Sequence, residues 1–226
     1  LQMATQEGSN GSVLAIKGNF DDAQSNVKKI FGDKSCADEL DRKGFFLSSA
    51  NSINWGRLVP QVVYYISAYC DLVSSGKINS GDNVNFCVPT GNFGNIFAAY
   101  IAKQMGLPIG KLICASNMNN VLTDFLETGT YDRNREFHLT MSPSMDILIS
   151  SNLERLLYFC AGAEETRKYM TSLSETGKYT VSDTVKSKID ELFVGYCTDE
   201  KMTSETIRTC FEKYGYLADT HTAVGI

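Results

Sequence analysis

The sequence lacks the features that define several specialised classes of protein. Polar residues interrupt every apolar run before about 18 positions, which excludes a membrane-spanning helix. No block of like charge is present, and 21 basic against 26 acidic residues give a net charge of −5, so nothing attracts nucleic acid. The first residues show neither the basic nor the apolar region of a signal peptide. We therefore expect a protein that binds neither nucleic acid nor membrane.

A metal-binding pattern is also missing. No two of the seven cysteines lie two to four residues apart, so the sequence predicts no zinc site and no other metal centre. Most of them lie within apolar runs such as NFCVP and LICAS, where a reduced thiol behaves as a small core residue. Free thiols are typical of reducing compartments, so we expect a cytoplasmic protein.

The order of apolar patterns predicts an α/β fold. Short apolar runs at residues 12–18, 83–89 and 111–117 predict strands, and helical periodicity covers residues 54–75, 96–106 and most of 152–215. Strands that alternate with helices in this way indicate a parallel sheet with covering helices.

Three further local features are expected. Residues 22–31 should form a helix, and the polar residues 32–43 should form a surface connection. Ser182 and Ser204 are expected as N-caps of helices, and Gly215 as a C-cap.

The motif VPTGNFGN is the clearest candidate for a binding site. An apolar strand ends at Pro89, a loop with Gly91 and Gly94 follows, and a helix begins near Asn95. Glycines permit a tight turn and a close approach to a ligand, and the unpaired N–H groups of a helix N-terminus bind phosphate. The alternative is a plain turn in which the glycines supply only permissive dihedral angles. The loop lacks the patterns of a Walker A loop and of dinucleotide-binding folds.

A second candidate is SSANSINWGR at residues 48–57. Ser52 and Asn54 are short hydrogen-bonding side chains, and Arg57 offers a bidentate fork for phosphate or carboxylate. The alternative is a helix N-cap with a solvated arginine. His138 and His221 have no nucleophile or second histidine at motif spacing, which gives a catalytic triad or a metal site little support.

Taken together, the motifs resemble threonine synthase of the longer bacterial and fungal kind, a family of fold-type II pyridoxal-phosphate enzymes. The resemblance covers almost the whole chain. In chain order it rests on GNFDDAQ, SANSINWGRLVPQ, VPTGNFGN, TDFLETGTYD, TMSPSMDI and HTAVG.

The resemblance implies a function and a division of the chain. Gly91, Asn92, Phe93, Gly94 and Asn95 would form a cup for the phosphate of pyridoxal 5'-phosphate. Ser52, Asn54 and Arg57 would hold the substrate, O-phospho-L-homoserine, which is converted with water to L-threonine and phosphate. Residues 1–50 would be the remnant of a small domain, and residues 51–226 a parallel-sheet large domain truncated at both ends.

The resemblance assigns no catalytic residue within residues 1–226. The family's cofactor lysine, in a motif like PT-x-AFKD, is expected before Leu1, and a threonine near the pyridine nitrogen after residue 226. Lys17 and Lys103 are expected at a strand end and on a helix surface. The cofactor is therefore expected in the whole protein, and this chain alone should be inactive.

Two alternatives and one open question accompany this interpretation. The protein could be a non-catalytic relative that binds a phosphorylated ligand, or another fold-type II lyase or dehydratase. Its state as a monomer or a weak oligomer is undecided.

Overall fold

The fold is described by a computed structural model that covers residues 7–18, 20–48 and 52–226. The chain divides into two compact units, Leu1–Ser48 and Ser49–Ile226. The assignment of residues 1–50 to a small domain and of residues 51–226 to a truncated large domain stays a prediction.

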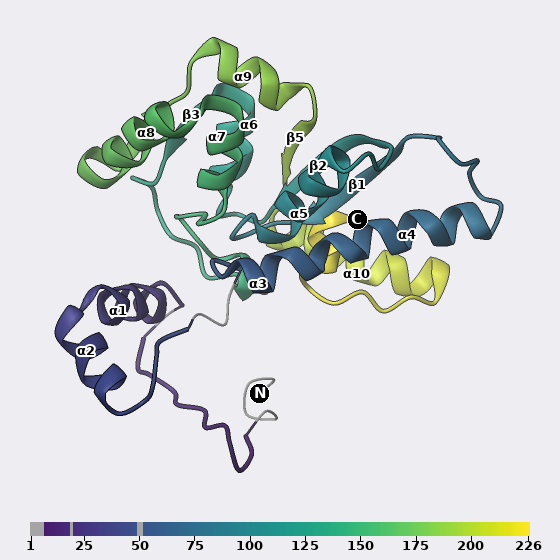
Figure 1. The fold of residues 1–226 in the computed structure, drawn as a ribbon. Helices are drawn as coiled ribbons and strands as arrows, with labels where there is room; N and C mark the ends of the chain where they lie inside the picture. Colours follow the sequence, from purple (N-terminus) through teal and green to yellow (C-terminus); the bar gives the residue numbers. More distant parts are fainter. Residues whose placement is uncertain (1–6, 19, 49–51) are drawn as a thin grey trace. The chain divides into compact units, whose positions relative to one another are not determined.

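In its described residues, the first unit contains two helices, α1 (Phe20–Gly32) and α2 (Lys34–Arg42) (Figure 1). The first is the helix predicted at residues 22–31. The second occupies most of the surface connection predicted at residues 32–43, and it has no buried residue, but it is a regular helix. The side chain of Asp33 accepts a hydrogen bond from the backbone N–H of Cys36, and this cap stabilises the start of α2.

The strand predicted at residues 12–18 was also wrong. The segment is irregular, and Leu14 is 90% exposed. A strand needs a hydrogen-bonded neighbour, and no described residue pairs with this segment.

The second unit is built on a parallel sheet with the strand order β1–β2–β5. A separate antiparallel pair consists of β3 and β4. Among the helices of the described residues, none combines the length and apolarity needed to cross a membrane. The elements are α3 (Trp55–Leu58), η2 (Val59–Gln61), α4 (Val62–Ser74), β1 (Val84–Pro89), α5 (Gly94–Gln104), β2 (Ile109–Ser116), α6 (Val121–Thr128), β3 (Thr130–Asp132), η3 (Pro143–Met145), α7 (Leu153–Ala161), α8 (Ala163–Thr176), β4 (Lys178–Thr180), α9 (Asp183–Asp190), β5 (Phe193–Cys197), α10 (Glu200–Tyr214) and η4 (Thr222–Gly225).

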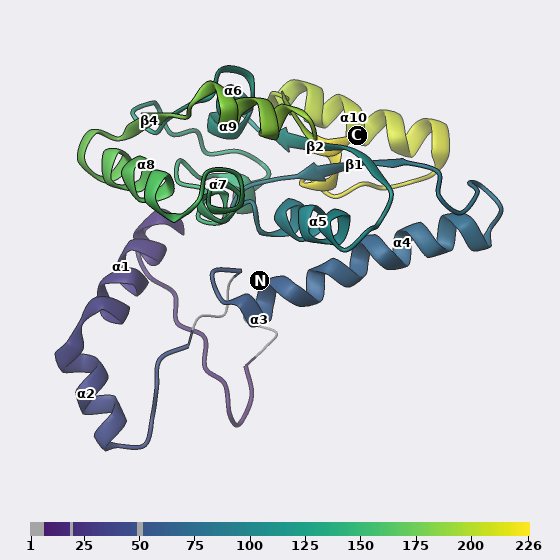
Figure 2. The same ribbon diagram turned by 45° about the horizontal axis from the view of Figure 1, so that its top comes forward.

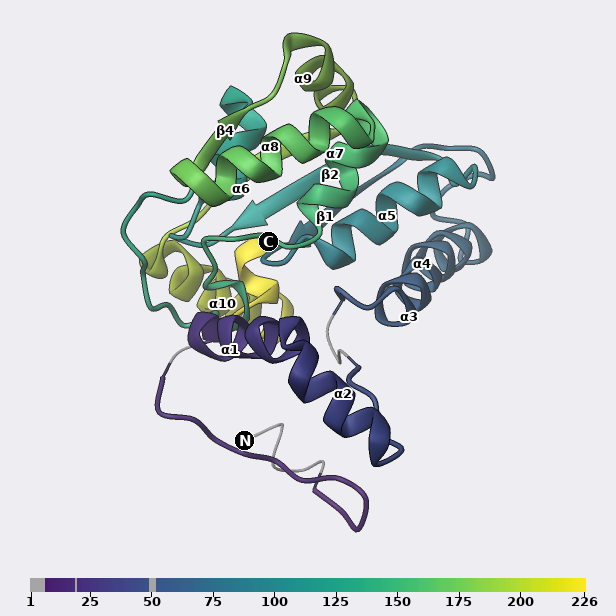
Figure 3. The same ribbon diagram turned by 60° about the vertical axis from the view of Figure 1, so that its left-hand side comes forward.

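The two faces of the sheet carry different elements. Side chains alternate along a strand, so Cys114 of β2 faces the main core while Ala115 packs with Met145 and Val224 on the other side. Accordingly, α5 and the η4–α10 segment lie on opposite sides of the sheet (Figure 2). On the α5 side, α4 packs along α5, and α7 also contacts α5 (Figure 3).

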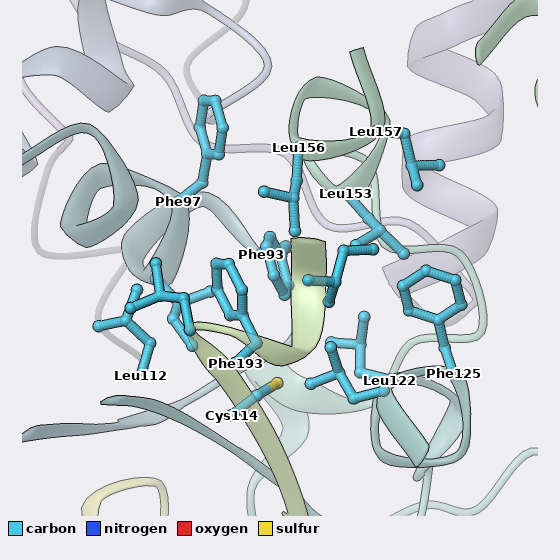
Figure 4. Close-up of a cluster of buried hydrophobic side chains, with 14 of the residues drawn as sticks. Phe93, Phe97, Leu112, Cys114, Leu122, Phe125, Leu153, Leu156, Leu157 and Phe193 are labelled. Carbon is cyan, nitrogen blue, oxygen red and sulfur yellow. The ribbon is translucent and has the colours of Figure 1, made fainter. Parts of the chain in front are cut away.

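The main core fills the space between the sheet and its covering helices (Figure 4). Phe93, in the loop after β1, belongs to this core, and the centre of its ring lies 5.6 Å from the centre of the Phe193 ring. The core therefore extends to the start of α5, where the candidate site lies. Its labelled members are Phe93, Phe97, Leu112, Cys114, Leu122, Phe125, Leu153, Leu156, Leu157 and Phe193.

The sequence missed β5, because residues 182–197 read as one helix. The helix α9 ends at Asp190, and the run FVGYC then pairs with β2 in parallel. Gly195 allows α6 to pack directly on β5, since a Cβ atom there would lie 2.9 Å from the Cα of Thr123.

The helix predicted at residues 54–75 is interrupted. It consists of α3 and α4 joined by the 3₁₀ turn η2, which contains Pro60. Proline has no N–H to donate to the preceding turn, so the chain tightens there.

The predicted caps were partly right. Ser182 and Gly215 are the N-cap of α9 and the C-cap of α10. Ser204, however, lies within α10. That helix is capped by Asp199, whose carboxylate accepts from the backbone N–H of Met202 at 2.7 Å.

Candidate functional site

The loop between β1 and α5 adopts a strained conformation. Phe93 has φ = 61°, and among the described non-glycine residues it alone has a positive φ. A bulky residue rarely occupies this region of backbone space, and such strain clusters at functional sites. Burial of the Phe93 ring in the core stabilises the conformation. Phe93 is also the N-cap residue of α5, and it makes no side-chain capping bond.

The carbonyl groups of this loop are bound by the segment that precedes α7. Ser150 Oγ donates to the Gly91 carbonyl at 2.7 Å. The backbone N–H and the Nδ2 of Asn152 both donate to the Asn92 carbonyl, at 3.1 and 2.9 Å. The carbonyl of one residue and the N–H of the next point in opposite directions across a trans peptide. The N–H groups of Asn92 and Phe93 therefore point away from residues 150–152.

The N–H groups of the same loop have no partner among the described residues. Within the described part of the chain, none of the residues from Gly91 to Asn95 donates its backbone N–H to a protein acceptor. Unpaired donors at the start of a helix can bind an anion through backbone hydrogen bonds and the helix dipole, and α5 begins at Gly94. The arrangement fits a phosphate group.

The two loop glycines allow other segments to approach closely. A Cβ atom on Gly91 would lie 2.8 Å from the Ser144 carbonyl oxygen, and one on Gly94 would lie 2.5 Å from Ser52 Oγ. The loop is therefore packed between the TMSPSMDI segment and the segment that begins at Ser52. Both motifs were singled out in the sequence, and the structure brings them to this loop.

The three residues predicted to hold substrate have different environments. Ser52 is partly buried, and its Oγ accepts a hydrogen bond from Asn152 Nδ2 at 2.9 Å. Asn54 is the N-cap of α3, and its side chain accepts from the backbone N–H of Gly56. Arg57 is exposed in the same helix, and its guanidinium group bonds to no described residue.

Asn95 contributes to the loop through its backbone only. Its side chain accepts a hydrogen bond from Tyr65 Oη and donates to Gln61 Oε1 at 3.0 Å. Burial raises the pKa of the Tyr65 hydroxyl, which therefore stays protonated and remains a donor. These bonds connect the first turn of α5 to η2 and α4.

Sequence reasoning missed Asn152 and Arg155. The Arg155 guanidinium donates to the carbonyl oxygens of Ser52 and Ile53 and to Asn152 Oδ1, and it lies 5.8 Å from the centre of the Trp55 ring. Partial burial lowers the pKa of this group, because desolvation disfavours its charged form. A polar SSN triplet before an apolar helix was the available signal, but it predicts only a helix cap.

The histidines and lysines considered in the sequence are in structural positions. His221 Nε2 accepts the backbone N–H of Ser144 at 3.1 Å and so holds the loop that packs on Gly91. The backbone of His138 exchanges hydrogen bonds with the side chain of Asn119. Lys103 Nζ donates to the carbonyl of Ile109, and Lys17 is exposed in an irregular segment.

Comparison with known proteins gives one consistent result. No family model matches the chain. The chain is 45% identical over 227 residues to human threonine synthase-like 1, covering 99% of this chain and 31% of that protein. It is 40% identical over 227 residues to threonine synthase of Pseudomonas aeruginosa, covering 100% of this chain and 46% of that protein.

Solved structures agree with these relatives. The crystal structure of threonine synthase with bound pyridoxal phosphate from Brucella melitensis matches with a TM-score of 0.81 and 45% identity, over 93% of this chain and 44% of that one. Yeast threonine synthase matches with a TM-score of 0.80 and 37% identity, over 94% and 43%. The predicted fold class, the α/β fold of fold-type II pyridoxal-phosphate enzymes, is confirmed. The chain spans less than half the length of these relatives.

Proposed function

Because the chain is homologous along its whole length to threonine synthases and threonine synthase-like proteins, we propose that its β1–α5 loop binds the phosphate of pyridoxal 5'-phosphate. The whole protein then converts O-phospho-L-homoserine and water to L-threonine and phosphate. The observation that carries the proposal is the set of backbone N–H groups from Gly91 to Asn95, which donate to no acceptor in the described part of the chain.

The loop binds and orients the cofactor's phosphate group. A net charge of −5 does not oppose this, because backbone N–H groups at a helix N-terminus attract anions locally. Each hydrogen bond to a charged group contributes about 1.5–3 kcal/mol. When bound, pyridoxal phosphate supplies the electron sink that lets protons leave the substrate carbons. The chain's own part is to place reacting groups, which can account for much of an enzymatic rate.

The segment from Ser52 to Arg57 positions the substrate. Arg57 is exposed and has no described partner, so its guanidinium group is available for the substrate phosphate. Arginine suits this role because its planar fork matches phosphate geometry. Ser52 and Asn54 support the segment through bonds to Asn152 and Gly56. This division assigns substrate recognition to α3 and cofactor binding to the start of α5.

Residues 1–226 contain no match to the family's lysine motif. Lys103, near the end of α5, donates its Nζ to the carbonyl of Ile109 in β2. We infer that this chain binds pyridoxal phosphate weakly by itself and does not turn over O-phospho-L-homoserine. The lysine and the ring contact must come from other parts of the whole protein.

A ligand comparison tests the loop. Pyridoxal differs from pyridoxal phosphate only by the phosphate ester, so the whole protein should bind it at least roughly 100-fold more weakly if two or more charged hydrogen bonds are lost. Calorimetric titration measures both affinities. Equal affinities would overturn the assignment of the loop.

An assay of products tests the reaction. The whole protein should release phosphate and threonine from O-phospho-L-homoserine in equal amounts. A second candidate is a threonine synthase-like protein that binds the phosphate ligand without catalysis. That candidate predicts cofactor binding without phosphate release. A dehydratase, in contrast, would release ammonia from serine or threonine.

A further inference from the structure

Asn152 hydrogen-bonds to both the β1–α5 loop and the segment that begins at Ser52, and the sequence assigned it no role. It is fully buried, at 0% exposure. Its Nδ2 donates to both Ser52 Oγ and the Asn92 carbonyl, and its Oδ1 accepts from Arg155. We propose that Asn152 is a positioning residue that couples anion binding at the β1–α5 loop to the placement of the Ser52–Arg57 segment. This inference rests on the proposed function of the loop.

The first half of the coupling lies in the loop. Two donors of Asn152, the backbone N–H and Nδ2, bind the same Asn92 carbonyl. Because the peptide is planar, fixing this carbonyl also fixes the direction of the Phe93 N–H. An anion that pulls on the Phe93 N–H therefore acts on Asn152 through one rigid peptide group.

The second half lies in the substrate segment. Asn152 Nδ2 holds Ser52 Oγ, and Asn152 Oδ1 holds the guanidinium of Arg155. Arg155 in turn donates to the carbonyls of Ser52 and Ile53. Asn152 and Arg155 thus both fix the start of the Ser52–Arg57 segment. A shift of Asn152 therefore moves this segment.

The chain has a built-in reporter of this coupling. Trp55 is its single tryptophan, and the Arg155 guanidinium lies 5.8 Å from the centre of its ring. A cation at that distance interacts with the ring face. Movement of Arg155 relative to Trp55 should therefore change the fluorescence of the protein.

The experiment titrates the 226-residue protein with inorganic phosphate at constant ionic strength, with chloride as the reference anion. Trp55 fluorescence and calorimetry are recorded in parallel. Phosphate is the probe because it does not absorb the emission of tryptophan. The wild type should show a saturable fluorescence change with the same Kd as the calorimetric one.

Two variants cut the coupling at different points. Asn152→Leu preserves volume but removes all side-chain bonds, so phosphate affinity should fall about tenfold and the fluorescence change should disappear. Ser52→Ala removes only the hydrogen bond between Asn152 Nδ2 and Ser52 Oγ. The fluorescence change should therefore shrink, while phosphate affinity falls less than in Asn152→Leu. Asn79→Ala is the matched control, because Asn79 lies in an exposed turn and, among the described residues, hydrogen-bonds only to Asp82. It should behave as the wild type.

The outcomes separate the coupling from the loop. If calorimetry detects phosphate binding but Trp55 does not respond, or if both variants match the wild type, the coupling is wrong and the loop assignment stands. If the wild type binds no phosphate by either method, the loop assignment fails and the coupling fails with it. Should Asn152→Leu not fold, the fluorescence change and affinity of Ser52→Ala decide the question.

Discussion

Replacing Gly94 with alanine tests how closely the Ser52 segment packs on the loop. A Cβ atom at this position would lie 2.5 Å from Ser52 Oγ, 2.7 Å from Ser52 Cβ and 3.3 Å from Asn152 Nδ2. Carbon atoms in good contact are about 3.5–4.0 Å apart. The new methyl group must therefore displace Ser52 or the start of α5.

The expected cost is moderate. Inserting a methyl group into a well-packed site costs about 1–3 kcal/mol. Alanine recovers about 0.5–1 kcal/mol in a helix relative to glycine, although this gain is smaller at the first residue of α5. A net loss of about 1–2 kcal/mol lowers the Tm of a domain of this size by roughly 2–8 °C.

Thermal unfolding followed by far-UV circular dichroism measures the effect. The double variant Gly94→Ala with Ser52→Gly removes both Ser52 atoms that clash, so it should be more stable than the sum of the two single changes predicts. Gly32→Ala is the control, because a Cβ atom at Gly32 meets nothing within 4 Å. A Gly94→Ala protein as stable as the wild type, or strict additivity in the double variant, would refute the packing argument.

Three further predictions concern the substrate segment, the acid sensitivity and the chain alone. In the whole protein, Arg57→Ala should lower kcat/KM for O-phospho-L-homoserine about 10–100-fold and leave pyridoxal-phosphate binding unchanged, with partial recovery in Arg57→Lys; unchanged kinetics would contradict the role. Hydrogen bonds from the Thr222 side chain and backbone N–H lower the pKa of Asp219 from 3.8 to about 2. Its contribution to stability is therefore present above about pH 4 and lost as pH falls toward 2, so Tm should drop less steeply over that range in Asp219→Asn; equal slopes would contradict this. Finally, the 226-residue protein assayed alone should release no phosphate from O-phospho-L-homoserine and show no visible absorbance of a lysine-bound cofactor; turnover near that of a full-length threonine synthase would contradict the assignment of the lysine.

The elements predicted correctly are those with a local signal. The strand β1 follows from an apolar run bounded by turn residues, and α5 from its helical period after Gly94. The strand β5 had no such boundary, because it follows α9 after two residues and continues its apolar pattern. It becomes a strand because β2 offers a hydrogen-bonding edge, as in the bond from the Leu112 N–H to the Leu192 carbonyl.

The segment at residues 12–18 shows the opposite case, an apolar run that forms no strand because it has no described neighbouring strand to pair with. Its apolar residues favour a strand by composition, yet no described residue pairs with it and Leu14 is exposed. Strand formation is a property of the pair, so composition alone predicts it poorly.

Some parts of the candidate site can be recognised from local sequence motifs, and others depend on residues far away in the sequence. The loop motif and the Ser52–Arg57 motif are visible as short patterns, and the structure brings Gly94 and Ser52 together. The residues that hold them, Asn152 and Arg155, lie about a hundred positions away from Ser52. No rule of spacing connects such positions, because their contact depends on the packing of α7 against α5.

The loop glycines have a different role from the one that their pattern suggests. One interpretation of the sequence was a turn in which Gly91 and Gly94 supply permissive dihedral angles, but the positive φ falls on Phe93 and on neither glycine. Instead, the lack of a side chain at Gly91 lets the Ser144 carbonyl pack closely, and the lack of one at Gly94 does the same for Ser52. Burial of the Phe93 ring compensates for its strained backbone, and residues 150–152 occupy the loop carbonyls. The Gly91 and Asn92 carbonyls are therefore occupied by protein donors, and among the described residues the loop N–H groups have no protein acceptor.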